Sequence, residues 1–199
     1  MKKKLTWVIL IIVLIGFARV YAIVDKTYSV FDTQTDTSEY MQIGLAKNES
    51  VSQEFISEEE HLDGISLKMS VTGEVDIKEI SYRVSDEDSN TIARGKESLE
   101  GLNMGKYFPI KFDRIENCKE KKYIFECYVT ECEDSGNIIL YEVPGAADGT
   151  ALTVKNQKYE GTLALRTISH GFDLETFIVT MCFILYVVLF VKWLAKVFK

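Results

Sequence analysis

The sequence predicts an all-β protein, an antiparallel β-sandwich outside a membrane that is flanked by two transmembrane helices. Three observations lead to this fold class: an apolar run at each end of the chain, the confinement of all acidic residues to the middle, and short runs of alternating apolar and polar residues between the ends. Period-two alternation over about five to eight residues is the pattern of half-buried strands. The 199 residues leave room for one ordinary domain between two such anchors.

The two apolar runs meet the requirements of membrane-spanning helices. The first covers residues 5–24 and contains one charged residue, Arg19. The second covers residues 174–195, and its apolar core is 176–191. A spanning helix needs about 20 largely apolar residues, and flanking lysines extend a shorter core because their ammonium groups reach the headgroup region.

The charges beside the two runs predict their orientation. Residues 1–4 contain three lysines, and residues 196–199 end the chain with two more. The acidic residues Asp25, Asp173 and Glu175 lie at the opposite ends of the runs. Because cytoplasmic flanks carry the excess of Lys and Arg, we expect both termini in the cytoplasm of a cell membrane and the central domain on the extracytoplasmic side.

The first run has an alternative interpretation as a cleaved signal peptide. Such a peptide also begins with basic residues and an apolar run, and it ends in small residues before the cleavage site. Residues 20–22 (VYA) fit that rule weakly, and Arg19 is unusual so close to a cleavage site. Both interpretations leave the central domain outside the membrane.

The middle of the chain is strongly acidic. All 30 Asp and Glu residues lie between positions 25 and 175, together with 16 of the 23 Lys and Arg residues, so this part carries a net charge of −14. A nucleic-acid-binding domain needs basic surface to replace phosphate counterions, so that class is disfavoured. The charge also disfavours direct capture of anionic polymers such as teichoic acids without bridging cations, whereas it permits a neutral glycan or a basic protein partner.

Alternating runs separated by polar, glycine-bearing turns predict eight or nine short strands, which suits a two-sheet antiparallel sandwich over residues 51–170. Residues 25–50 are expected to hold a linker and the first strand region, with the Thr-rich stretch 28–39 as the linker. The predicted strands lie in residues 52–56, 64–71, 79–84, 90–94, 108–112, 123–129, 138–142, 151–154 and 162–166.

Part of this pattern resembles a known module. Five pieces carry the resemblance and span about residues 51–141: 53–55 (QEF), 62–67 (LDGISL), the strand–turn–strand 80–92, 105–110 (GKYFPI) and 122–125 (KYIF). Their order is similar to the galactose-binding-like β-sandwiches found outside the membrane in Gram-positive surface-polysaccharide and membrane-glycosyltransferase proteins. The resemblance implies a jelly roll and a role with carbohydrate or envelope polymer. It carries no binding residue onto this chain, because ligand contacts in such modules lie in variable loops.

The sequence predicts no catalytic residue, no cofactor and no metal site, and it leaves the ligand-binding residues unknown. The two histidines, His61 and His170, stand far apart in the chain, and the common hydrolase, zinc-protease, phosphate-loop and dinucleotide motifs are not present. A pair of carboxylates for glycoside hydrolysis carries no information in a chain with 30 acids. We therefore expect a protein that is not an enzyme.

One segment has the spacing of calcium ligands. Asp86, Asp88, Asn90 and Glu97 occupy the first, third, fifth and twelfth positions of an EF-hand-like loop. The sixth position is Thr91, where the sharp turn of such a loop calls for glycine, and the flanks have strand patterns where an EF-hand has helices. A hairpin turn is the interpretation that the sequence favours.

Cysteine usage permits one internal disulfide at most. Cys118 and Cys132 flank the strand 123–129 and are the candidate pair, whereas Cys127 shares the apolar face of that strand and is expected in the core. Cys182 lies within the second apolar run. The sequon that begins at Asn48 is best explained as a chance match.

Together these features predict a membrane-anchored extracytoplasmic binding or accessory protein. The expected partners, besides the lipid bilayer, are a cell-envelope polysaccharide or a membrane glycosyltransferase. A structural scaffold or sensor subunit of a membrane complex is the alternative, and a hydrolase or transferase acting on envelope glycans is a further one.

Overall fold

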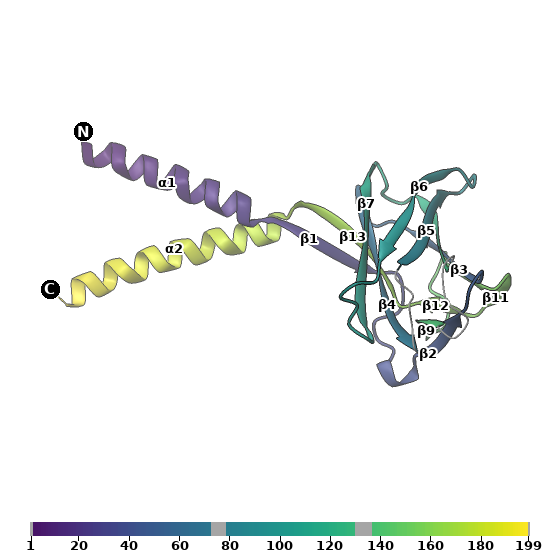
Figure 1. Ribbon diagram of the computed structural model, residues 1–199. Coiled ribbons are helices and arrows are strands. Elements are labelled where there is room, and N and C mark those ends of the chain that lie inside the picture. Colours follow the sequence, from purple (N-terminus) through teal and green to yellow (C-terminus); the bar gives the residue numbers. More distant parts are fainter. Residues whose placement is uncertain (1, 73–78, 130–136, 199) are drawn as a thin grey trace. The chain divides into compact units, whose positions relative to one another are not determined.

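A computed structural model describes residues 2–72, 79–129 and 137–198, which divide into two compact units. One unit is Thr27–Ser169, and the other combines Met1–Lys26 with His170–Lys199. The first is a β-sandwich, and the second contains the two long helices together with the strand ends that join them to the sandwich (Figure 1).

The described residues form two antiparallel sheets. The seven-stranded sheet contains β1 (Ile23–Ser29), β2 (Met41–Leu45), β4 (His61–Thr72), β7 (Lys106–Glu116), β9 (Asn137–Pro144), β12 (Gly161–Leu163) and β13 (Leu165–Phe172). The six-stranded sheet contains β3 (Ser50–Ile56), β5 (Glu79–Asp86), β6 (Thr91–Ser98), β8 (Lys122–Tyr128), β10 (Ala151–Val154) and β11 (Gln157–Tyr159). A short 3₁₀ turn, η1 (Thr37–Glu39), precedes β2.

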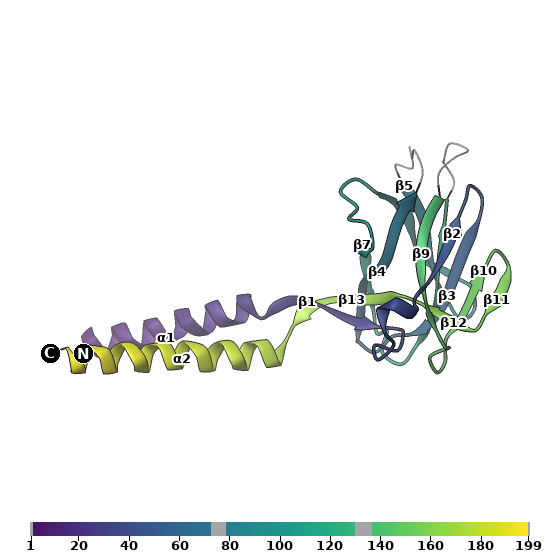
Figure 2. The ribbon, with the colours of Figure 1, turned by 90° about the horizontal axis from the view of Figure 1, so that it is seen from below.

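In the seven-stranded sheet, β4 and β9 pair directly at one end and are separated by other strands at the other end. Strands β7, β4, β9 and β2 lie side by side, and β4 pairs directly with β9 between Met69 and Thr72 (Figure 2). Beyond that stretch the two strands separate, and residues 161–172 enter between them. In this segment β12 pairs with β9 and β13 pairs with β4. At the change of partner, Ala164 donates its backbone N–H to Tyr141 and accepts one from Lys68.

The core lies between the two sheets and follows the predicted alternation. In β8 every second side chain is buried: Tyr123, Phe125 and Cys127 point inward. Facing residues from the other sheet include Leu67 and Met69 of β4. Each fully buried large apolar side chain of this kind contributes about 1.5–3 kcal/mol relative to an exposed one. The prediction of a two-sheet sandwich, and of Cys127 as a core residue, is confirmed.

Next to Gly64 the pairing of β4 with β7 contains a bulge, in which β7 carries the extra residues, and the close approach of the two strands there requires glycine. The register between β4 and β7 shifts between Leu62 and Gly64. A Cβ atom on Gly64 would lie 2.7 Å from the carbonyl oxygen of Ile110 and 3.3 Å from the Cα of Lys111. Both neighbours are backbone atoms, so the close approach of β7 to β4 leaves no room for a side chain.

The strand count needs correction. The described residues contain thirteen strands, where the sequence predicted eight or nine. Both β1 and β2 lie within or across residues 25–50, and Phe31, in the stretch predicted as a linker, is buried. The sequence analysis did not predict β1, because its first residues, Ile23 and Val24, continue the apolar run 5–24 and were assigned to the membrane span.

Two helices belong to the second unit. Helix α1 covers Lys2–Tyr21 and ends three residues before the end of the predicted span, since β1 begins at Ile23. Helix α2 covers Leu174–Val197 and is the one helix among the described residues that is long and apolar enough to cross a membrane. The described apolar part of α1, Ile11–Tyr21, is shorter. The coarser prediction of an apolar C-terminal helix is therefore confirmed.

A capping contact starts α2. The carboxylate of Asp173 accepts hydrogen bonds from the backbone N–H and the hydroxyl of Thr176, as expected of an N-cap residue. Lys26 of β1 forms an ion pair with the same carboxylate at 2.7 Å. These contacts, that with Lys26 first, lower the pKa of Asp173, so the carboxylate stays charged at neutral pH.

Candidate binding face on the seven-stranded sheet

Five side chains gather on the outer surface of the seven-stranded sheet, and we call this group the Tyr–cation face. Alternation along each strand explains why they point outward. In β4 the neighbours Leu67 and Met69 enter the core, so Lys68 between them faces away from it. The members come from the loop before β2 and from β4, β7, β9 and β13: Tyr40, Lys68, Tyr107, Tyr141 and Arg166.

Both cations of the Tyr–cation face lie over aromatic rings. The guanidinium carbon of Arg166 is 3.8 Å from the centroid of the Tyr107 ring. The ammonium nitrogen of Lys68 is 4.8 Å from the Tyr40 ring centroid and 5.2 Å from that of Tyr141. The electron-rich face of each ring attracts a cation at these distances, by about 0.5–2 kcal/mol depending on how much water is excluded.

A small apolar cluster supports the rings from below. Phe31, Val143 and Ala164 are buried, and the half-buried rings of Tyr40, Tyr107 and Tyr141 pack against them. Phe31 and Tyr40 meet edge to face with ring centroids 6.2 Å apart.

Hydrogen bonds fix the ring of Tyr141 in place. Its hydroxyl lies 3.1 Å from the hydroxyl of Ser70, which in turn accepts the backbone N–H of Gly105 at 2.8 Å. The rings are therefore held by packing and by hydrogen bonds, and they hold the two cations in defined positions.

The protonation states of the Tyr–cation face follow from its surroundings. Burial raises the pKa of the Tyr107 phenol, because the phenolate would lose its hydration, while the neighbouring Arg166 opposes that shift. Tyr107 is therefore a neutral phenol at physiological pH. The face presents two positive charges and hydrogen-bond donors, a chemistry suited to oxygen-rich ligands.

Arg166 has one polar group without a partner. Its Nε atom is buried and makes no hydrogen bond to any residue that the structure describes. A guanidinium group has five N–H donors in a planar fork, and a buried donor without an acceptor costs about 1–3 kcal/mol.

Two hollows lie elsewhere on the sandwich, each of about 340 Å³. The first is lined by Tyr28 and by three carboxylates, those of Asp32, Glu58 and Asp148, among other residues. The second includes Asp86 and residues 87–88 of the segment with calcium-ligand spacing, and Lys121 and Lys122 line it as well. Two ammonium groups beside these carboxylates oppose the binding of a divalent cation there.

The segment with calcium-ligand spacing is a hairpin turn. It joins β5 to β6, and Asp86 accepts hydrogen bonds from the backbone and the side chain of Asn90 at 2.8 and 3.0 Å. These bonds, the side-chain bond first, lower the pKa of Asp86. Glu97 pairs with Ile80, six residues before Asp86 in β5, which places it roughly 20 Å away along the strand. The structure thus does not bring the four residues together.

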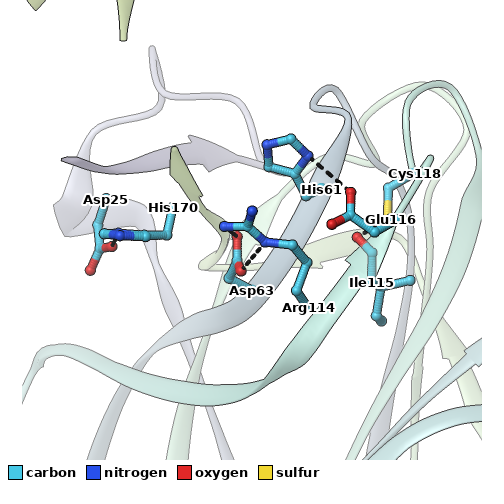
Figure 3. A network of polar contacts seen from close by, with 8 residues as sticks. All are labelled: Asp25, His61, Asp63, Arg114, Ile115, Glu116, Cys118 and His170. Atoms are coloured by element: carbon cyan, nitrogen blue, oxygen red, sulfur yellow. Dashed lines mark hydrogen bonds and ion pairs between the residues drawn. The ribbon is translucent and has the colours of Figure 1, made fainter. Parts of the chain in front are cut away.

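The two histidines have separate acidic partners (Figure 3). In the sandwich, His61 lies 3.5 Å from Glu116, beside the ion pair of Asp63 with Arg114 at 2.8 Å. In the unit that contains the helices, the Nδ1 atom of His170 lies 2.6 Å from the carboxylate of Asp25. Each pair bridges two neighbouring strands and is explained by strand pairing alone.

The two cysteines that the structure describes in the sandwich, Cys118 and Cys127, are buried thiols. Cys118 is fully buried and donates a hydrogen bond to the carbonyl oxygen of Ile115 at 3.0 Å (Figure 3). Burial raises the pKa of Cys118, and it raises the pKa of Cys127 to about 12. Cys118 and Cys127 are both free thiols, and Cys132, the candidate disulfide partner of Cys118, lies outside the described residues.

Sequence reasoning did not find the Tyr–cation face. The five residues are spread from position 40 to position 166, and no two of them form a motif. Alternation within the strands marks Lys68 and Arg166 as outward-facing. Which strands are neighbours depends on long-range pairing, and a single sequence carries no signal for it.

Comparisons with known proteins add little to this geometry. No family model and no curated protein matches the chain. Among solved structures, the clostridial cysteine protease Cwp84 after propeptide cleavage is similar over 74% of this chain and 40% of that one, with 11% identity and a TM-score of 0.43. The chain thus spans less than half of that protein. A likeness at this level assigns no residue role and no activity to the chain.

Proposed function

We propose that this chain is a membrane-anchored binding protein that presents its sandwich on the extracytoplasmic side and binds a cell-envelope polysaccharide through the Tyr–cation face. One observation carries the proposal: Lys68 and Arg166 are held on tyrosine rings, on the outer surface of a sheet, in the part of the chain (residues 25–175) whose net charge is −14. Rigid aromatic side chains with adjacent hydrogen-bond donors suit the recognition of a polyhydroxylated chain.

The proposed topology is supported by the two ends of the chain. Helix α2 has the length and composition of a membrane span, and lysines follow its apolar core. Helix α1 begins in the basic N-terminal segment. Under the positive-inside rule both termini are cytoplasmic and the sandwich, a jelly roll by the resemblance of its sequence, is extracytoplasmic.

Binding is proposed in preference to catalysis. The polar residues that the sequence analysis considered are each in contact with another polar side chain: Asp86 with Asn90, His61 with Glu116, and His170 with Asp25. General acid–base catalysis needs a titratable group aimed at a position that a substrate can occupy. These groups instead face one another across a turn or between strands.

A second candidate function is that of an accessory subunit of a membrane glycosyltransferase, and the aromatic row on α2 favours it. The rings of Tyr186, Phe190 and Trp193 stack in sequence, with successive centroids 6.0 Å apart. Residues three and four apart share one helix face. A rigid aromatic ridge within an apolar helix suits packing against another membrane helix as well as against lipid.

The experiment that tests the proposal uses the full-length chain in nanodiscs of neutral lipid, with envelope polysaccharide of the native host immobilised on a surface. We expect retention of the wild-type chain and at least tenfold weaker retention of the double variant Lys68→Gln/Arg166→Gln. Arg83→Gln is the matched control, because Arg83 is a strand arginine that forms an ion pair with Glu126.

Equal retention of all three proteins would show that the Tyr–cation face is not the binding site. Absence of retention, together with stoichiometric co-purification of a glycosyltransferase from native membranes, would replace the proposal by the accessory-subunit function. In that case, substitution of Tyr186 and Phe190 by leucine should release the enzyme.

A further inference from the structure

The rings of the Tyr–cation face are already occupied by the protein's own cations. Arg166 covers one face of Tyr107, and Lys68 lies over both Tyr40 and Tyr141. A neutral sugar that stacked on those ring faces would have to displace the cations and lose their attraction to the rings. The face therefore offers a ligand its positive charges and N–H donors more readily than bare aromatic surface.

Neither cation is neutralised within the described part of the sandwich. No carboxylate of a described residue lies within ion-pair distance of Lys68 or Arg166, although the domain has a large excess of acids. Other cations of the chain do have carboxylate partners: Lys26 with Asp173, Arg83 with Glu126, Lys96 with Glu79, Arg114 with Asp63, Lys122 with Glu54, and Lys155 with Glu49.

The two cations come from neighbouring positions of the same sheet face. In the register of β13 and β4, Arg166 pairs with Ser66, two residues before Lys68. Arg166 and Lys68 are therefore diagonal neighbours on the same face of the sheet, with Cα atoms roughly 7–8 Å apart. Two long cationic side chains at this spacing can approach two oxygens of a single carboxylate or phosphate.

The charge of the whole domain limits what kind of anion can bind. Residues 25–175, which include the sandwich, carry a net charge of −14, and this charge repels a dense polyanion and lowers its local concentration at the surface. Two cations can offset that repulsion for one anionic group, but not for a charge on every residue of a polymer.

We infer that the Tyr–cation face recognises a glycan that is mostly neutral and carries isolated anionic groups, and that Lys68 and Arg166 together bind such a group, either a carboxylate or a phosphate. This inference rests on the proposed function and gives its ligand a chemical class. The rings position the cations, and the surrounding acids select against heavily charged polymers.

The test uses the full-length chain in neutral nanodiscs and oligogalacturonides of one length in three forms: fully methyl-esterified, with a single free carboxylate, and fully de-esterified. We expect the form with one carboxylate to bind at least tenfold more tightly than the fully esterified form, and more tightly than the fully charged form at low salt. A mono-phosphorylated oligomannoside, compared with its unphosphorylated parent, separates phosphate from carboxylate as the preferred group.

Variants connect the preference to the two cations. Arg166→Gln and Lys68→Gln should each abolish the tenfold preference, whereas Arg83→Gln should retain it. Arg166→Lys keeps the charge but loses the planar fork, so part of the preference should remain. Circular dichroism of each variant shows whether the sandwich is folded, and the two Gln variants test the inference independently if one of them does not fold.

The outcomes separate this inference from the proposed function. If charged and esterified oligomers bind equally and the Gln variants bind like the wild type, the inference is wrong while binding of glycans stands. If the fully charged oligomer binds best, selection for isolated charges is wrong. If neither these oligomers nor the native polysaccharide bind, the proposed function fails and the inference fails with it.

Discussion

The outer faces of the two sheets use their cationic side chains differently. On the six-stranded sheet, arginine and lysine lie beside carboxylates of adjacent strands: Arg83 with Glu126, Lys122 with Glu54, and Lys96 with Glu79. In the middle of the seven-stranded sheet, Lys68 and Arg166 lie on tyrosine rings. Both arrangements hold long side chains in place, but they leave different net charges at the surface.

The difference shows how a strongly acidic domain can keep a positively charged site. A cation beside a carboxylate forms a neutral pair, and an exposed pair of this kind contributes about 0–1 kcal/mol to stability. A ring holds a cation without cancelling its charge, because the attraction comes from the ring quadrupole. The charges of Arg83, Lys96 and Lys122 on the six-stranded sheet are therefore neutralised, whereas Lys68 and Arg166 on the seven-stranded sheet keep a charge that a ligand can use.

The largest effect is expected from removal of the ring under Arg166. Tyr107→Ala should lower the free energy of unfolding of the sandwich by about 2 kcal/mol, because it removes a half-buried ring from the cluster around Phe31 and leaves the guanidinium without its support. Tyr107→Phe keeps the ring and should cost about 0.5 kcal/mol or less. Urea denaturation of the full-length protein in nanodiscs, followed by far-UV circular dichroism, measures both values.

A matched change on the other sheet tests the comparison itself. Glu126→Ala removes the partner of Arg83 on an exposed surface, and we expect a loss of about 0–1 kcal/mol. If this loss equalled that of Tyr107→Ala, the two faces would not differ in the way described above.

Much of the sandwich follows from the sequence because its strands alternate clearly. The run 64–71 lies in β4 and the run 123–129 covers β8 except for its first residue and extends one residue beyond it, and the inward-facing residues are those that alternation predicts. The edge of the fold was harder to predict. Strand β11, at the edge of its sheet, has three exposed residues, Gln157–Tyr159, so no burial pattern marks it.

The Tyr–cation face could not be predicted, since it depends on which strands are neighbours. Tyr107 lies opposite Lys68 in the register that β4 and β7 keep from Gly64 to Met69, and this register differs from the one before the bulge. Arg166 reaches Tyr107 because residues 161–172 enter between β4 and β9 and place β13 beside β4. Local alternation predicts whether a side chain points inward or outward. It does not predict which strands are neighbours or in which register they pair.

A smaller effect on stability is expected from replacing Glu142, a carboxylate of β9 that is only 3% exposed. Its side chain shares the inward side of β9 with Ile138 and Leu140 and lies where a side chain of residue Gly161 would be. Burial raises the pKa of Glu142 above 4.5, because the carboxylate loses hydration. The folded state then binds the proton more tightly than the unfolded state does, so stability falls as the pH rises from the unfolded pKa through the folded one.

Glu142→Gln should remove this penalty at neutral pH and stabilise the protein by on the order of 1 kcal/mol. The difference between variant and wild type should shrink toward zero as the pH falls below the pKa of the unfolded chain, where Glu142 is protonated in both states. Thermal unfolding of the two proteins between acid and neutral pH measures it. Stabilisation that did not change with pH would have to come from packing and would contradict the electrostatic explanation.

The two kinds of cation contact should differ in how their coupling energies respond to salt. A double-mutant cycle on Arg83 and Glu126 should give a coupling of about 0.5 kcal/mol at low salt that falls toward zero at high salt, since both charges are exposed enough to be screened. The corresponding cycle on Arg166 and Tyr107, with Gln and Leu as replacements, should give about 1 kcal/mol and change little with salt, because the ring carries no net charge and the pair is partly buried. If both couplings fell equally with salt, Arg166 would be interacting mainly with a carboxylate. The charge that the Tyr–cation face offers to a ligand would then already be neutralised.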